Sequence, residues 1–104
     1  MLHIEKLSLH NFKSFRQATL KFDEGFNCIV GPNGSGKSSL CDSLLFVLGE
    51  TSLRRMRVSS LQQLINNSAK PNPDDGIKRG WVSVTLAGGE EGPVEIIRIV
   101  KSNG

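Results

Sequence analysis

The segment GPNGSGKSS, residues 31–39, constrains the fold of this 104-residue chain more than any other stretch. Its fixed positions match the spacing G-x-x-x-x-G-K-[ST] of a phosphate-binding P-loop. An apolar run at residues 26–30 precedes it and predicts a buried strand, while the helical spacing of apolar residues after Gly36 predicts a helix that ends near Gly49. Strand, glycine-rich loop and helix follow in the order that this motif requires.

The residue types in the loop suit a polyphosphate ligand. Successive backbone N–H groups and the positive end of a helix dipole attract negative charge. Gly31, Gly34 and Gly36 keep side chains away from the phosphates and permit positive φ angles. Lys37 is expected to reach the β- and γ-phosphates, and the Ser38 hydroxyl to coordinate Mg²⁺.

Strand-like patterns lie on both sides of the predicted helix. Residues 4–12 are β-like but imperfect, because Leu7 and Leu9 fall on one parity while Ile4 and Phe12 fall on the other. Apolar residues at 18, 20 and 22 alternate cleanly with polar ones. We expect two antiparallel strands joined around the sequence KSFRQ.

The second half of the chain predicts a short helical segment, a loop and a hairpin. Apolar residues share one side of a possible turn of helix at residues 61–65, and the composition of residues 71–80 is that of a loop. A hairpin is expected over about residues 81–100. In its second strand, 94–100, isoleucines occupy both parities, which predicts either that both faces are covered or that the strand contains a bulge.

Composition gives weaker constraints. The chain has 13 basic and 10 acidic residues, a mild excess that is compatible with a nucleotide or nucleic-acid partner. Cys28 and Cys41 lie among apolar neighbours without metal-ligand spacing, so we expect two unpaired, buried thiols in an intracellular protein. The scattered charges of the N-terminus and the lack of a long apolar run predict neither secretion nor membrane insertion.

Three segments together resemble a known family. NFKSF at residues 11–15, GFNCIVGPNGSGKSSLCDSLLFVLGE at 25–50 and MRVSSLQQLI at 56–65 are similar to the N-terminal lobe of SMC proteins, the ABC-type ATPases of cohesin, condensin and prokaryotic chromosome segregation. The RecF and RecN ATPases share the P-loop, whereas FKSF and LLFVLGE distinguish the SMC pattern. The resemblance implies an α/β P-loop NTPase fold, a partial ABC-type head lobe with an antiparallel β subdomain packed beside the strand, P-loop and helix.

The resemblance also implies a set of site residues. ATP would be bound by Lys13, Ser14, Gly31, Pro32, Asn33, Gly34, Ser35, Gly36, Lys37, Ser38 and Ser39. Ser38 would ligate Mg²⁺, and Lys37 would act in catalysis together with Arg57, which resembles an arginine finger acting on the phosphates of the same head. Basic residues at 70, 78 and 79 are weaker candidates for contacts with DNA phosphates.

The implied domain is the N-terminal portion of a head, residues 1–104, incomplete at its C-terminus. The sequence holds no apolar run ending in Asp-Glu, as in a Walker B motif, and no signature segment, so this chain alone is not expected to turn over ATP. Its implied partners are a C-terminal SMC head lobe, a second SMC head and chromosomal DNA, with a chromosome-associated location and no membrane.

Three alternatives stay open at the level of sequence. One is a RecF- or RecN-like lobe of a DNA-repair ATPase, and another is a truncated module that binds ATP or a partner without hydrolysis. A third is a small nucleotide kinase, which would need an acidic base and an arginine-bearing lid that the downstream sequence does not show.

Overall fold

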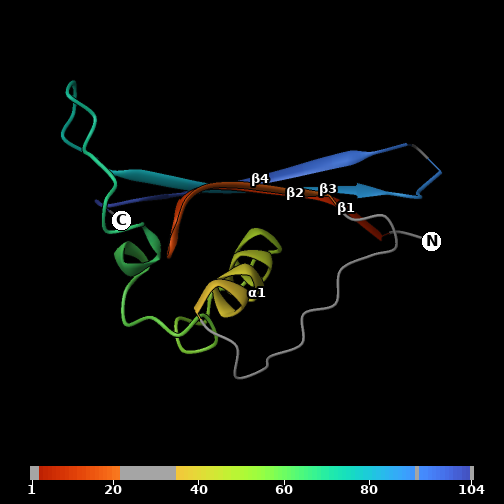
Figure 1. Ribbon diagram of the computed structural model, residues 1–104, viewed down its shortest axis with the longest axis horizontal. Coiled ribbons are helices and arrows are strands. Elements are labelled where there is room, and N and C mark those ends of the chain that lie inside the picture. Colours follow the sequence, from red (N-terminus) through yellow and green to blue (C-terminus); the bar gives the residue numbers. More distant parts are fainter. Residues whose placement is uncertain (1–2, 22–34, 91, 104) are drawn as a thin grey trace.

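The computed structural model describes residues 3–21, 35–90 and 92–103, and for residues 35–38 it describes the backbone alone. Four strands, one α-helix and one 3₁₀ helix make up this part of the chain (Figure 1). In chain order they are β1 (His3–Phe12), β2 (Phe15–Lys21), α1 (Ser35–Val47), η1 (Leu61–Leu64), β3 (Arg79–Ala87) and β4 (Val94–Lys101). The predicted strand at 26–30 lies outside the described residues.

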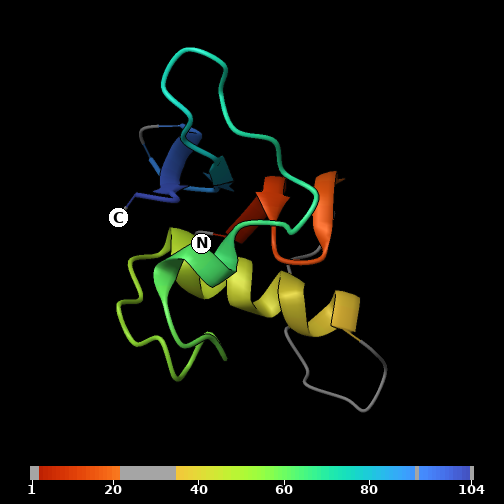
Figure 2. The same ribbon diagram turned by 90° about the vertical axis from the view of Figure 1, so that its left-hand side faces the viewer.

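The strands form one antiparallel sheet in the order β2-β1-β3-β4, and α1 packs across one of its faces (Figures 1 and 2). The predicted pairing of the first two strands is confirmed, with Lys13 and Ser14 alone between them. The predicted hairpin is also confirmed, although β3 begins at Arg79, inside the predicted loop. The helical segment at 61–65 is a 3₁₀ turn, after which Ile65 forms an isolated bridge to Phe12. The mixed α/β class is therefore confirmed.

Two irregularities in the backbone of β1 explain why its apolar residues do not alternate regularly. The register against β3 shifts between Ile4 and Lys6, so Ile4 packs against the same core as Leu7 and Leu9. At the other end, Asn11 has a φ of 51°, in the left-handed region, and Phe12 is fully buried. Because each irregularity changes the parity of the strand, all the apolar side chains of β1 reach the core.

The core lies between the sheet and α1. Phe46 and Val47 of the helix are buried against Val82 and Val84 of β3, together with Met56 from the following loop. The apolar spacing that predicts the helix does not coincide with the buried face of α1. Leu45 and Leu48 have exposed fractions of 37% and 56%. Leucine spacing alone did not identify the buried face, because the adjacent pair at 46 and 47 takes that position.

Gly49 ends the helix as predicted. Its φ is 104°, its N–H donates to the Phe46 carbonyl at 3.1 Å, and the Glu50 N–H donates to the Leu45 carbonyl at 3.0 Å, which is a Schellman-type cap. Arg98 of β4 donates to the Phe46 and Glu50 carbonyls at 2.8 Å each. A cation at this end of a helix is favourable, so β4 and the cap together hold the end of α1 on the sheet.

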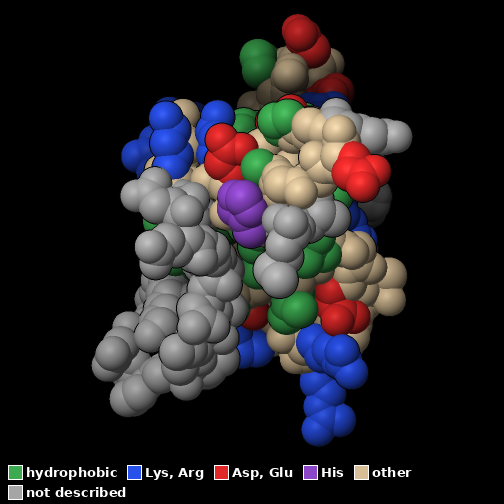
Figure 3. All heavy atoms as spheres, turned by 90° about the vertical axis from the view of Figure 1, so that its right-hand side faces the viewer, with side chains coloured by type: hydrophobic (Ala, Val, Ile, Leu, Met, Phe, Trp, Pro, Cys, Tyr) green, Lys and Arg blue, Asp and Glu red, His purple; other side chains and the backbone are tan. Residues whose placement is uncertain are grey.

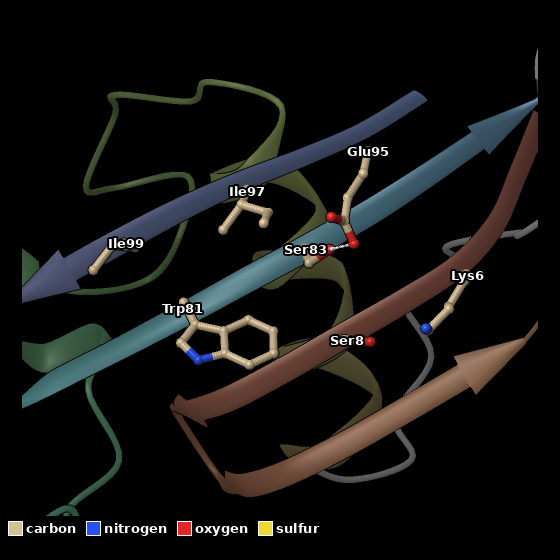
Figure 4. Close-up of a pocket in the computed structure, with 7 residues that line it drawn as sticks. All are labelled: Lys6, Ser8, Trp81, Ser83, Glu95, Ile97 and Ile99. Atoms are coloured by element: carbon tan, nitrogen blue, oxygen red, sulfur yellow. Dashed lines mark hydrogen bonds between the residues drawn. The ribbon is translucent and has the colours of Figure 1, made fainter. Parts of the chain in front are cut away.

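Both expectations for β4 are wrong. Its register with β3 runs without a shift from Arg79↔Lys101 to Leu86↔Val94, so it has no bulge there, and Ile97 and Ile99 are each 56% exposed. Their face of the sheet is the one opposite α1. An open hollow of about 330 Å³ lies on this face, as Figure 4 shows, lined by Lys6, Ser8, Trp81, Ser83, Glu95, Ile97 and Ile99.

The expectation of two unpaired thiols is wrong for Cys41, which is in a disulfide. Cys28 lies outside the described residues. The argument from cysteines to a reducing compartment therefore loses its support. Among the described helices, none is long and apolar enough to cross a membrane.

Candidate nucleotide-binding site

Helix α1 starts at Ser35, inside the predicted P-loop, so the backbone of the last five residues of the GPNGSGKSS segment forms the first turn of the helix. An α-helix leaves its first N–H groups without intrahelical acceptors, and these can bind an anion. Gly31, Pro32, Asn33 and Gly34 lie outside the described residues, as do the side chains of Lys37 and Ser38. The arrangement around the first two turns of α1 carries the structural argument.

Two segments distant in sequence reach these turns. The β1–β2 turn arrives through Ser14, whose hydroxyl donates to the Ser39 hydroxyl at 3.1 Å. Ser39 is buried, with 3% of its surface exposed. The loop after α1 arrives through Arg57. The structure therefore brings together four candidate residues predicted from the sequence: Lys13, Ser14, Ser39 and Arg57.

A buried carboxylate that sequence reasoning missed lies at the centre of this arrangement. The Lys13 Nζ atom donates to Asp42 Oδ2 at 2.6 Å, and Arg57 Nη2 and Nε donate to the same oxygen at 2.5 and 3.2 Å. Asp42 is 3% exposed. A signal was present: Asp42 follows Ser38 by four residues, so the two share one face of the helix, and it is the one acidic residue in α1.

Both cationic residues have unusual backbones. Lys13 has a φ of 49° and Arg57 a φ of 60°, in the left-handed region that favours glycine. Hydrogen bonds hold Lys13 there: its N–H donates to the Leu64 carbonyl, and Asn66 Nδ2 donates to its carbonyl, each at 2.7 Å. Strained backbones of this kind concentrate at functional sites, where the surrounding structure offsets their cost.

These groups fit a polyphosphate. Asp42 is four residues past Ser38, about 6 Å along the helix axis, which is within reach of a lysine or arginine side chain. Two cations and one carboxylate leave a net positive charge beside a helix N-terminus, where anions are favoured. For Mg²⁺, the described residues hold no group of three or more histidine, cysteine or acidic side chains that could bind a metal.

The predicted DNA contacts find less support. Arg79 forms an ion pair with Asp75, with Nη2 and Oδ2 2.6 Å apart. The hydrogen bond from Arg79 lowers the pKa of Asp75, and the same bond raises the pKa of Arg79. Residues 71–78 form a loop on the opposite side of the sheet from α1 (Figure 2). On the face drawn in Figure 3, basic side chains form separate groups with acidic ones beside them.

Comparison with known proteins shows the family to which the chain belongs. The family described as the RecF/RecN/SMC N terminal domain matches residues 3–104. The chromosome partition protein Smc of Methanocaldococcus jannaschii is 51% identical over 65 residues, which cover 62% of this chain and 6% of that protein. The chain spans 6–7% of the length of the curated relatives it matches.

Solved structures agree in fold. The Smc head domain of Pyrococcus furiosus, with an extended coiled coil and bound to the C-terminal domain of ScpA, has a TM-score of 0.80 at 38% identity and covers all of this chain, which spans 28% of it. An SMC ATPase from work on ATP-driven dimerization and DNA-stimulated activation has a TM-score of 0.77 at 38% identity, with 98% of this chain and 65% of that one covered. The chain belongs to the RecF/RecN/SMC N-terminal domain family and has the fold of an SMC ATPase head.

Proposed function

We propose that residues 1–104 form the N-terminal, ATP-binding part of an SMC-type ATPase head. The observation that carries this proposal is the convergence of Lys13, Ser14 and Arg57 on the first turns of the helix that the P-loop motif opens. None of these three contacts is required by the P-loop motif itself, so they support the nucleotide site independently of it.

In this proposal the residues have distinct roles. The triphosphate lies against the backbone of residues 31–39, Lys37 neutralises the β- and γ-phosphates, and Ser38 ligates Mg²⁺. Ser14 and Lys13 approach from the β1–β2 turn. Arg57 supplies a guanidinium that offsets charge developing on the transferred phosphoryl group.

The partners follow from the relatives. One similar SMC ATPase is described as dimerizing in response to ATP and as activated by DNA, and another SMC head is bound to ScpA. We infer that this chain acts with a C-terminal head lobe, a second head and chromosomal DNA, and that a ScpA-like protein is a further partner. ATP held between two heads would then drive their engagement on DNA. The expected location is chromosome-associated and inside the cell.

The test is Mg-ATP binding to the 104-residue chain and to Lys37→Ala by calorimetry, with circular dichroism to confirm folding. We expect Lys37→Ala to weaken binding about 100-fold, because a charge-assisted contact to phosphate contributes roughly 1.5–3 kcal/mol. Lys70→Ala, which removes an exposed lysine, is the matched control and should bind like the wild type.

Turnover measured in the same samples tests the second half of the proposal. We expect none from this chain alone, and turnover after a matching C-terminal lobe is added. Robust hydrolysis by the isolated chain would contradict the proposal that turnover needs a C-terminal lobe. Equal binding by the wild type and Lys37→Ala would contradict the site itself.

A further inference from the structure

Asp42 has no role in the proposed chemistry, yet its buried carboxylate pairs with both cations near the site. Three hydrogen bonds from two cations end on one oxygen, Oδ2, and the residue is 3% exposed. A buried charge is retained at a cost unless it is paired and hydrogen-bonded. Here the pairing joins two segments that are 44 positions apart in sequence, at Lys13 and Arg57.

We propose that Asp42 is a positioning residue, which holds Lys13 and Arg57 beside the first turns of α1 and through them sets the affinity for Mg-ATP. This inference rests on the proposed function. It concerns a residue that itself does not touch the nucleotide.

Lys13 and Arg57 depend on Asp42 for their position to different degrees. The Arg57 side chain is 52% exposed, and without Asp42 it would sample many rotamers in solvent. The Lys13 side chain is 14% exposed and also donates to the Met56 carbonyl at 3.0 Å. Ordering long side chains before a ligand arrives removes that entropic cost from binding, which is the physical basis of preorganisation.

Asp42 Oδ2, which accepts from both cations, also reduces the repulsion between them. Two cations that approach one phosphate repel each other in the empty site, and a carboxylate between them offsets that repulsion. Because Asp42 lies on α1 itself, the cations are fixed relative to the same helix whose N-terminus binds the phosphates.

The main test is Asp42→Asn, which keeps the shape of the side chain and removes its charge. We expect Mg-ATP affinity to fall about 10-fold by calorimetry. The decisive comparison repeats the substitution in a Lys13→Gln/Arg57→Gln background. If Asp42 acts through the two cations, the substitution changes affinity there by less than 2-fold.

Ser43→Ala is the matched control, since Ser43 is the next residue, is also buried, and donates to the Leu40 carbonyl at 2.6 Å, away from both cations. It should bind like the wild type. If Asp42→Asn does not fold, Asp42→Glu keeps the charge on a longer side chain and should still weaken binding several-fold by displacing the cations.

Each outcome decides the matter. Absence of Mg-ATP binding by the folded wild-type chain would overturn both the proposed function and this inference. Wild-type binding that Lys37→Ala weakens but Asp42→Asn leaves unchanged or tightens would overturn the inference alone. A 10-fold loss that persists in the Lys13→Gln/Arg57→Gln background would show that Asp42 acts on the helix and not through the cations.

Discussion

Gly80→Ala should lower the free energy of unfolding by about 3 kcal/mol or more, the upper end of what an overpacked site costs. Gly80 is buried in β3, where an added Cβ would lie well inside van der Waals contact of the Asn11 carbonyl oxygen and 3.1 Å from the His10 carbonyl oxygen. Both obstacles are backbone atoms, so no side-chain rotation can relieve the clash. Urea unfolding followed by circular dichroism measures the loss.

The same substitution should weaken nucleotide binding in whatever fraction stays folded. The bend of β1 at Asn11 crosses Gly80, and it leads directly into the turn that carries Lys13 and Ser14. Gly92→Ala is the control, because its Cβ would meet no atom within 4 Å. Its φ of +87° still makes alanine unfavourable, by about 1 kcal/mol. Similar losses for the two variants would contradict the role assigned to close packing at Gly80.

Phe46→Ala should cost about 4 kcal/mol, within the range for removing a buried aromatic side chain. Phe46 is 1% exposed, its ring centroid is 5.5 Å from that of Phe12, and the Arg98 guanidinium lies 4.2 Å from its centroid. The substitution leaves a cavity between α1 and the sheet and also removes a cation–π contact. Urea unfolding followed by the fluorescence of Trp81, the single tryptophan, reports the change.

Leu48→Ala provides the comparison on the same helix. Leu48 is 56% exposed, so its loss should change the free energy of unfolding by less than about 0.5 kcal/mol. Comparable destabilisation by the two substitutions would mean that the outer side of α1 is buried in solution. It would also contradict the assignment of the core to the sheet-facing side.

Local patterns in the sequence predicted the elements well. The P-loop spacing located the start of α1 and Gly49 its end, and runs of strand-forming residues separated by turns located β1, β2, β3 and β4. These signals are local, because helix caps, turns and the period of a strand depend on neighbouring residues.

The features that the sequence did not predict depend on contacts between distant segments. The left-handed backbones at Asn11 and Lys13 carry no glycine to signal them, and they are fixed by hydrogen bonds to the segment around Leu64 and Asn66. The ion pairs of Asp42 were missed for the same reason, since its partners come from two separate turns. The exposure of Ile97 could not be inferred either, because alternation shows that a strand has two faces but not which of them other residues cover.

The left-handed backbone of Arg57 is a position where stability and the proposed nucleotide binding favour different residues. Its φ of 60° suits glycine, its own side chain is 52% exposed, and the buried Asp42 carboxylate keeps Lys13 as a partner if the guanidinium is removed. A search for stabilising substitutions would therefore accept glycine at this position and remove the guanidinium without any sign of damage to the fold. Under the proposed function, stability and nucleotide chemistry make opposing demands on this residue, and only a selection that measures both would keep the arginine.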